Sequence, residues 1–74
     1  MSRYPLWVAF DPVNRSAFVR GKDARQAVLD AGGRPQWLPR SRQWATTEKT
    51  GRELVARAEC DGRQVFLSEI GGAS

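Results

Sequence analysis

Histidine is absent from this chain of 74 residues, and cysteine occurs once, at Cys60. Without imidazole, the chain cannot form a Ser-His-Asp triad or an ordinary histidine zinc site. A single cysteine excludes both an internal disulfide and a cysteine-rich metal cluster. We therefore expect no metal site and no cofactor.

Motifs of covalent catalysis are also missing. No Ser-x-x-Lys, Gly-x-Ser-x-Gly or phosphate-binding glycine loop occurs, and the eight carboxylates show no paired motif. Cys60 lies near the predicted end of a helix, where the helix dipole disfavours a thiolate, so we interpret it as an inert, buried small residue. The sequence predicts no catalytic residue and a protein that is not an enzyme.

Long hydrophobic runs are missing as well, since the longest covers only residues 6–10. A signal peptide or a membrane span needs a longer run, so we expect a cytoplasmic protein without membrane contact. The chain is long enough for one small domain, and 41% hydrophobic and 27% charged residues are ordinary for a folded one.

The first half of the chain indicates a hairpin followed by a helix. Residues 4–10 and 16–20 have strand composition and flank a turn-forming segment. Ala24, Ala27, Val28 and Ala31 then recur at helical spacing, which predicts a helix over residues 22–31 that ends at the two glycines 32–33.

The second half repeats this order. A shift of 27 positions aligns Arg15 with Arg42 and Val28 with Val55, and a further shift of two aligns Gly33 with Gly62. The repeat predicts strands over residues 36–40 and 43–46, a helix ending near residue 60 and a last strand over 64–70. Thr47 or Thr50 is the expected cap of the second helix, and Thr50 with Glu53 fits a capping box.

These elements predict an α+β fold, a small two-layer domain of order β-β-α-β-β-α-β. Its two helices cover one face of an antiparallel or mixed sheet. The repeat units cover residues 4–33 and 34–62, the closing strand 64–70, and residues 71–74 form a loose tail. The strand order stays open.

Positive charge is concentrated in the first part of the chain. The net charge is +4, with +5 in residues 1–44 and −1 in residues 45–74. Residues 34–44 hold three arginines and two tryptophans with no acid, a composition typical of nucleic-acid surfaces, because guanidinium groups bind phosphates and tryptophan stacks on bases.

Large aromatic side chains on short strands usually fill the core of so small a protein. We accordingly assign Trp7, Phe10, Phe18 and Phe66 to the core. Trp37 aligns with Phe66 and is assigned to the core with them. Trp44 is the tryptophan expected to be partly exposed.

The favoured function is non-enzymatic binding of nucleic acid, in particular DNA. The expected binding residues are Arg15, Arg20, Arg34, Arg40, Arg42 and Trp44. Arg15 and Arg42 occupy equivalent hairpin turns and could clamp successive phosphates of a duplex.

The alternative is a protein-interaction module, of a kind that phages and mobile elements use on host proteins, or a homodimer. An exposed edge strand, either residues 64–70 or 4–10, would then pair with the partner protein or the second copy.

Overall fold

The computed structural model describes residues 4–69 and confirms the predicted order of elements. The tail predicted at 71–74 lies outside the described residues. The elements are the strands β1 (Leu6–Asp11), β2 (Ser16–Arg20), β3 (Gln36–Leu38), β4 (Gln43–Thr47) and β5 (Val65–Glu69), and the helices α1 (Ala24–Asp30) and α2 (Glu48–Cys60). The α+β class is also confirmed.

The five strands form one mixed sheet in the order β3-β4-β2-β1-β5. Both hairpins are antiparallel, and β2 joins them by pairing with β4. The last strand, β5, runs parallel to the first, β1. Of the two strands named as possible free edges, β5 does lie at an edge, whereas β1 lies between β2 and β5 and pairs with both.

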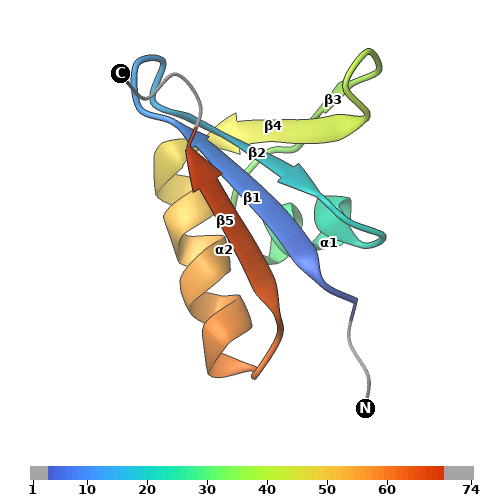
Figure 1. Cartoon of the computed structure of the whole chain (residues 1–74), viewed down its shortest axis with the longest axis vertical. Coiled ribbons are helices and arrows are strands. Elements are labelled where there is room, and N and C mark those ends of the chain that lie inside the picture. Colours follow the sequence, from blue (N-terminus) through green and yellow to red (C-terminus); the bar gives the residue numbers. More distant parts are fainter. Residues whose placement is uncertain (1–3, 70–74) are drawn as a thin grey trace.

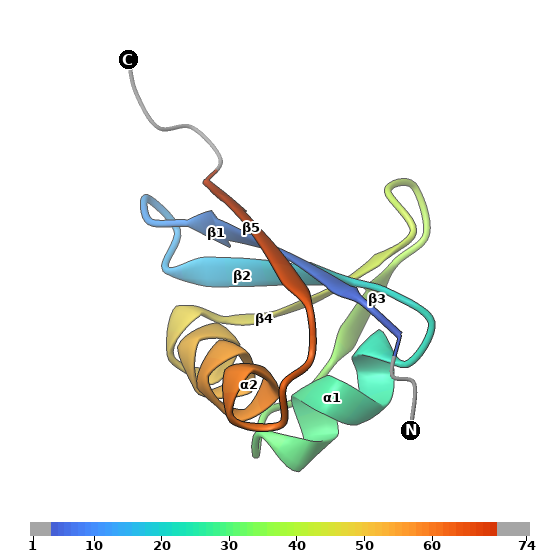
Figure 2. The same ribbon diagram turned by 60° about the horizontal axis from the view of Figure 1, so that its bottom comes forward.

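Both helices cover the same face of the sheet (Figures 1 and 2). Alternate residues of the strands point toward them, and these residues, with the inner faces of the helices, form the core. The buried apolar residues are Leu6, Val8, Ala17, Val19, Ala24, Val28, Leu54, Val55 and Ala58. The small residues among them allow the helices to lie close to the strands.

Thr47 caps the start of helix α2, because its hydroxyl oxygen accepts a hydrogen bond from the Thr50 N–H at 3.2 Å. Of the two expected caps, Thr47 is therefore the correct one, and Thr50 lies inside the first turn, where it cannot head a capping box. One turn further on, Gly51 faces the sheet. A β carbon on Gly51 would lie 2.6 Å from the Ala17 β carbon, so only glycine permits this close approach.

The internal repeat is visible in the ends of the helices. Gly32 and Gly62 both have a positive φ, of 86° and 73°, and each donates to a carbonyl three residues earlier. The next amide donates to a carbonyl five residues earlier in both cases, at 3.0 and 2.8 Å. Gly62 therefore corresponds to Gly32 in the structure, whereas the sequence alignment pairs it with Gly33. The segment that ends with α2 is one residue longer than that alignment assumes.

Candidate functional site

The two hairpin tips hold arginines in the same unusual conformation. Arg15 has a φ of 53° and Arg42 a φ of 51°, and they are the described non-glycine residues with positive φ. Arg15 and Arg42 are therefore equivalent in backbone conformation as well as in their position in the repeat.

The two tips nevertheless lie at opposite ends of the sheet (Figure 1). Ser16 pairs with Thr47, and the Arg15 carbonyl accepts from the Glu48 N–H at 2.9 Å, which places the first tip beside the start of α2. The second tip precedes β4, which starts beside the end of β2. Antiparallel pairing between the repeats thus separates the two arginines that the sequence suggested as a clamp.

Three of the five predicted arginines gather at one end of the sheet. Arg20 ends β2, and Val19 pairs with Trp44, so Arg20 lies next to the hairpin tip that holds Arg40 and Arg42. All three are exposed. Arg34 precedes β3, which runs antiparallel to β4, and therefore lies toward the other end, as Arg15 does.

We call the face of the sheet that is turned away from the helices the open face (Figure 2). It carries exposed aromatic side chains. Trp7 of β1 and Phe66 of β5 are direct neighbours on it, with ring centroids 5.5 Å apart and planes 18° from parallel. They remain 40% and 44% exposed. Phe18 of β2 lies on the same face and is half-buried. The assignment of Trp7, Phe18 and Phe66 to the core is therefore wrong, whereas Phe10 does pack against the core.

A guanidinium group lies beside this aromatic pair. The Arg20 Cζ atom is 5.9 Å from the centre of the Trp7 ring, and Arg20 and Trp7 are paired across β1 and β2. The neighbouring row of the open face holds Ser68, Ala9, Phe18 and Ala45. Because most of these side chains are small, they leave a shallow hollow of about 340 Å³ bordered by Trp7, Phe18, Arg20, Gln43 and Phe66.

Charge is distributed unevenly between the helices and the sheet. Residues 22–32 and 48–63, which form the helices and their flanking turns, contain six basic and six acidic side chains. The remaining described residues contain five arginines and only two acids, Asp11 and Glu69. Asp11 lies at the Arg15 end, where it accepts hydrogen bonds from Asn14. The excess positive charge thus lies on the sheet and is greatest at the Arg20 end.

The other two tryptophans lie on the helix side of the sheet. Trp37 and Trp44 are paired across β3 and β4, with ring centroids 4.9 Å apart. Trp44 packs against the core, whereas Trp37 is 46% exposed, so their expected order of exposure is reversed. Trp44, a predicted binding residue, consequently does not share the open face with Arg20.

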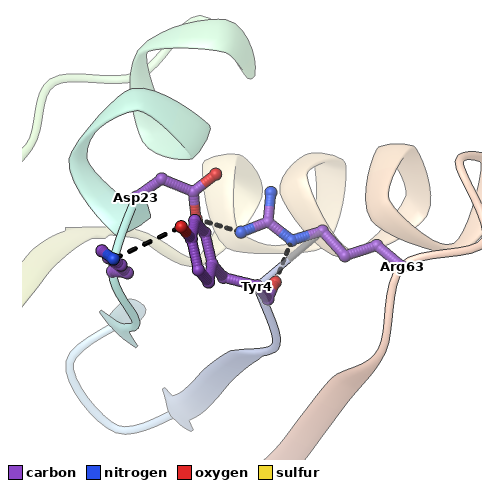
Figure 3. A network of polar contacts seen from close by, with 4 residues as sticks. Tyr4, Asp23 and Arg63 are labelled. Carbon is purple, nitrogen blue, oxygen red and sulfur yellow. Dashed lines mark hydrogen bonds and ion pairs between the residues drawn. The ribbon is translucent and has the colours of Figure 1, made fainter. Parts of the chain in front are cut away.

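A sixth arginine, Arg63, has a structural role (Figure 3). Its Nε donates to the Tyr4 carbonyl at 2.7 Å, and its Nη2 forms an ion pair with Asp23. The side chain is only 7% exposed. Asp23 precedes α1 but makes no capping hydrogen bond, because its carboxylate faces Arg63. Arg63 therefore links the turn that follows α2 to Tyr4 and to Asp23 at the start of α1. Its guanidinium group is not available to a ligand.

Within residues 4–69, no three metal-ligating side chains come together. Cys60 is exposed, so its interpretation as a buried residue is wrong. Neither described helix has the length and apolar character that crossing a membrane requires.

No protein-family model, curated protein or solved structure matches this chain. The residues of the open face and of the hairpin tips must therefore carry the functional inference by themselves.

Proposed function

We propose that the protein binds single-stranded nucleic acid on the open face of its sheet. The observation that carries this proposal is the nearly parallel pair of exposed rings, Trp7 and Phe66, with the Arg20 guanidinium beside it. Exposed aromatic rings on a sheet are stacking surfaces for unpaired bases, and each stacked base contributes about 1–3 kcal/mol.

The phosphates of the strand would follow the arginines at one end of the sheet. Arg20, Arg40 and Arg42 lie there together and are exposed, and the acids of the helices are on the opposite side. A strand whose bases lie on Trp7 and Phe66 can thus extend its backbone across these guanidinium groups. Arg15 and Arg34 lie too far along the sheet to share this contact, and Trp44 is turned away from it.

Fluorescence anisotropy with labelled single-stranded DNA, single-stranded RNA and duplex DNA tests the proposal. Three phosphate contacts to a single strand give a salt slope of about −2, which weakens binding about 20-fold between 50 and 200 mM salt. We expect the single strands to bind more tightly than the duplex, because stacking requires unpaired bases.

Matched variants separate stacking from general charge. Trp7→Ala should weaken binding about fivefold or more, whereas Trp37→Ala, which removes an equally exposed tryptophan from the other face, should leave it within about twofold. Phe66→Leu retains apolar surface but removes the ring, and thus tests stacking in a variant that keeps its packing. Equal effects of Trp7→Ala and Trp37→Ala would refute the proposed surface.

Two arginines form a second matched pair. Arg42→Gln should lower the salt slope by about 0.7, whereas Arg15→Gln, at the equivalent turn position of the other end, should leave it unchanged. Equal losses at both tips, together with a preference for duplex DNA, would instead support the two-tip clamp.

A protein-interaction module is the second candidate, because Trp7 and Phe66 would also suit an apolar protein contact. That function predicts no measurable binding of nucleic acid even at low salt. It also predicts that added salt does not weaken the association with the protein partner.

A further inference from the structure

The outer edge of β5 is not paired with any described residue. The Leu6 N–H donates to the Gln64 carbonyl at 3.1 Å, so the backbone groups of Gln64 face β1. Successive residues of a strand direct these groups to alternate sides, so those of Phe66 and Ser68 also face β1. The N–H and C=O groups of Val65, Leu67 and Glu69 consequently face away from the sheet.

A groove of about 820 Å³ runs along this edge, between β5 and α2. Phe10, Val55 and Leu67 provide its apolar lining, and Leu67 is 57% exposed. Val65, Leu67 and Glu69 point to the helix side, because they are in register with Leu6, Val8 and Phe10. The free backbone groups of β5 therefore adjoin an apolar groove.

Acidic side chains line both ends of this groove. Since α2 and β5 run in opposite directions, Glu59 lies near the start of β5, and Glu48 and Glu69 lie near its end (Figure 1). The only base that lines the groove among the described residues, Arg52, is 3.8 Å from the Glu48 carboxylate and offsets that acid. A protein of net charge +4 thus has an acidic groove beside its free strand edge.

The opposite edge of the sheet differs in each of these respects. The strand there, β3, has only three residues, and Pro35 and Pro39 flank it. Short strands and prolines are the devices by which proteins prevent further strands from pairing at an edge. β5 contains no proline, lysine or arginine.

We propose that β5 and this groove bind an extended peptide by strand addition. The backbone of the peptide would bond to Val65, Leu67 and Glu69. Every second side chain of the peptide would face the groove. A central apolar side chain among these would contact Leu67 and Phe10, and the basic side chains on either side of it would lie near Glu59 and Glu69. A second copy of the chain is a poorer occupant, because two identical grooves would bring like charges together.

Amide hydrogen exchange with a defined peptide tests this inference. The probe is an acetylated and amidated peptide of sequence Thr-Arg-Thr-Leu-Thr-Arg-Thr, and its control has glutamate in place of both arginines. In the free protein, the amides of Leu67 and Glu69 should exchange rapidly, whereas the amide of Phe66 should be protected. Saturating probe should slow exchange at Leu67 and Glu69 at least about tenfold, and the acidic control should have no effect.

Variants identify the contacts through peptide anisotropy. Leu67→Pro removes one N–H that faces outward and leaves the bonds to β1, so it should weaken binding about tenfold, more than Leu67→Ala does. Glu59→Gln combined with Glu69→Gln should also weaken binding, whereas Glu53→Gln, on α2 but outside the groove, should not.

Several results would overturn the inference. Equal binding of the acidic and basic peptides would remove the charge argument. Concentration-dependent protection of the Leu67 and Glu69 amides without peptide would assign the edge to a second copy. Protection confined to the open face would assign the peptide to another surface. Exchange and the glutamate variants decide the matter even where Leu67→Pro fails to fold.

Discussion

Gly51→Ala should destabilise the protein although it improves the helix. Alanine is favoured over glycine inside a helix by about 1 kcal/mol, so at an exposed site this change would stabilise α2. At Gly51 the new methyl group would lie 2.6 Å from the Ala17 β carbon and 3.0 Å from the Phe10 ring. The ring can rotate away, but the Ala17 β carbon is fixed to a central strand, so α2 must move outward.

Overpacking of this kind costs about 1–3 kcal/mol, which outweighs the gain in helix propensity. We expect a net loss of about 1 kcal/mol, which in a domain of this size lowers Tm by roughly 4–8 °C. Urea unfolding followed by circular dichroism measures the free energy directly. Ala56→Gly, at an exposed position of the same helix, measures propensity alone and should cost about 1 kcal/mol.

The double variant Gly51→Ala with Ala17→Gly isolates the contact. Removing the Ala17 methyl group restores the space, so the two changes together should be at least about 1 kcal/mol less destabilising than the sum of their separate effects. A gain in stability from Gly51→Ala alone, or strictly additive effects, would contradict the close packing of α2 on β2.

Three further substitutions test local features. Thr47→Ala removes the hydroxyl that accepts from the Thr50 N–H and should cost about 1 kcal/mol in urea unfolding; an unchanged midpoint would show that the cap contributes nothing. Arg63→Met retains the buried stem but leaves the Tyr4 carbonyl and Asp23 without their donor, and should cost about 1–2 kcal/mol by the same assay. Arg42→Gly relieves a positive φ and should raise stability by up to about 1 kcal/mol while it weakens nucleic-acid binding; loss of stability would contradict the left-handed turn.

Local signals in the sequence were sufficient for the elements and their order. The change of apolar spacing from two to about four residues marks the passage from strand to helix at residues 20–24, and Gly32 and Gly62 mark the helix ends through their positive φ. These are properties of a few consecutive residues. They predict the order β-β-α-β-β-α-β without any knowledge of tertiary contacts.

The open face could not be predicted, because both faces of β1 are apolar. Leu6 and Val8 point to the helices, while Trp7 and Ala9 point the other way, and this run is equally typical of a strand covered on both sides. Only the placement of α1 and α2 on one face decides which residues remain exposed. The two helices cover the smaller aliphatic residues and leave Trp7 uncovered.

The positions of the arginines depend on pairing between distant strands. The sequence correctly identified Arg15 and Arg42 as equivalent, and their φ values agree within 2°. It could not indicate that β2 would pair with β4 in the antiparallel direction, which places the tips at opposite ends. That pairing also brings Arg20 beside Arg42, which the spacing of residues along the chain could not indicate.

The parallel pairing of β1 with β5 sets the order in which the chain can fold during synthesis. Each hairpin can form as soon as its two strands leave the ribosome, but one edge of β1 stays open until Val65–Glu69 has been made. Loop closure over so long a segment is slow compared with hairpin formation. A nascent chain therefore exposes one edge of β1 until Val65–Glu69 has been made, and chaperone binding or pairing with another chain would compete at that edge.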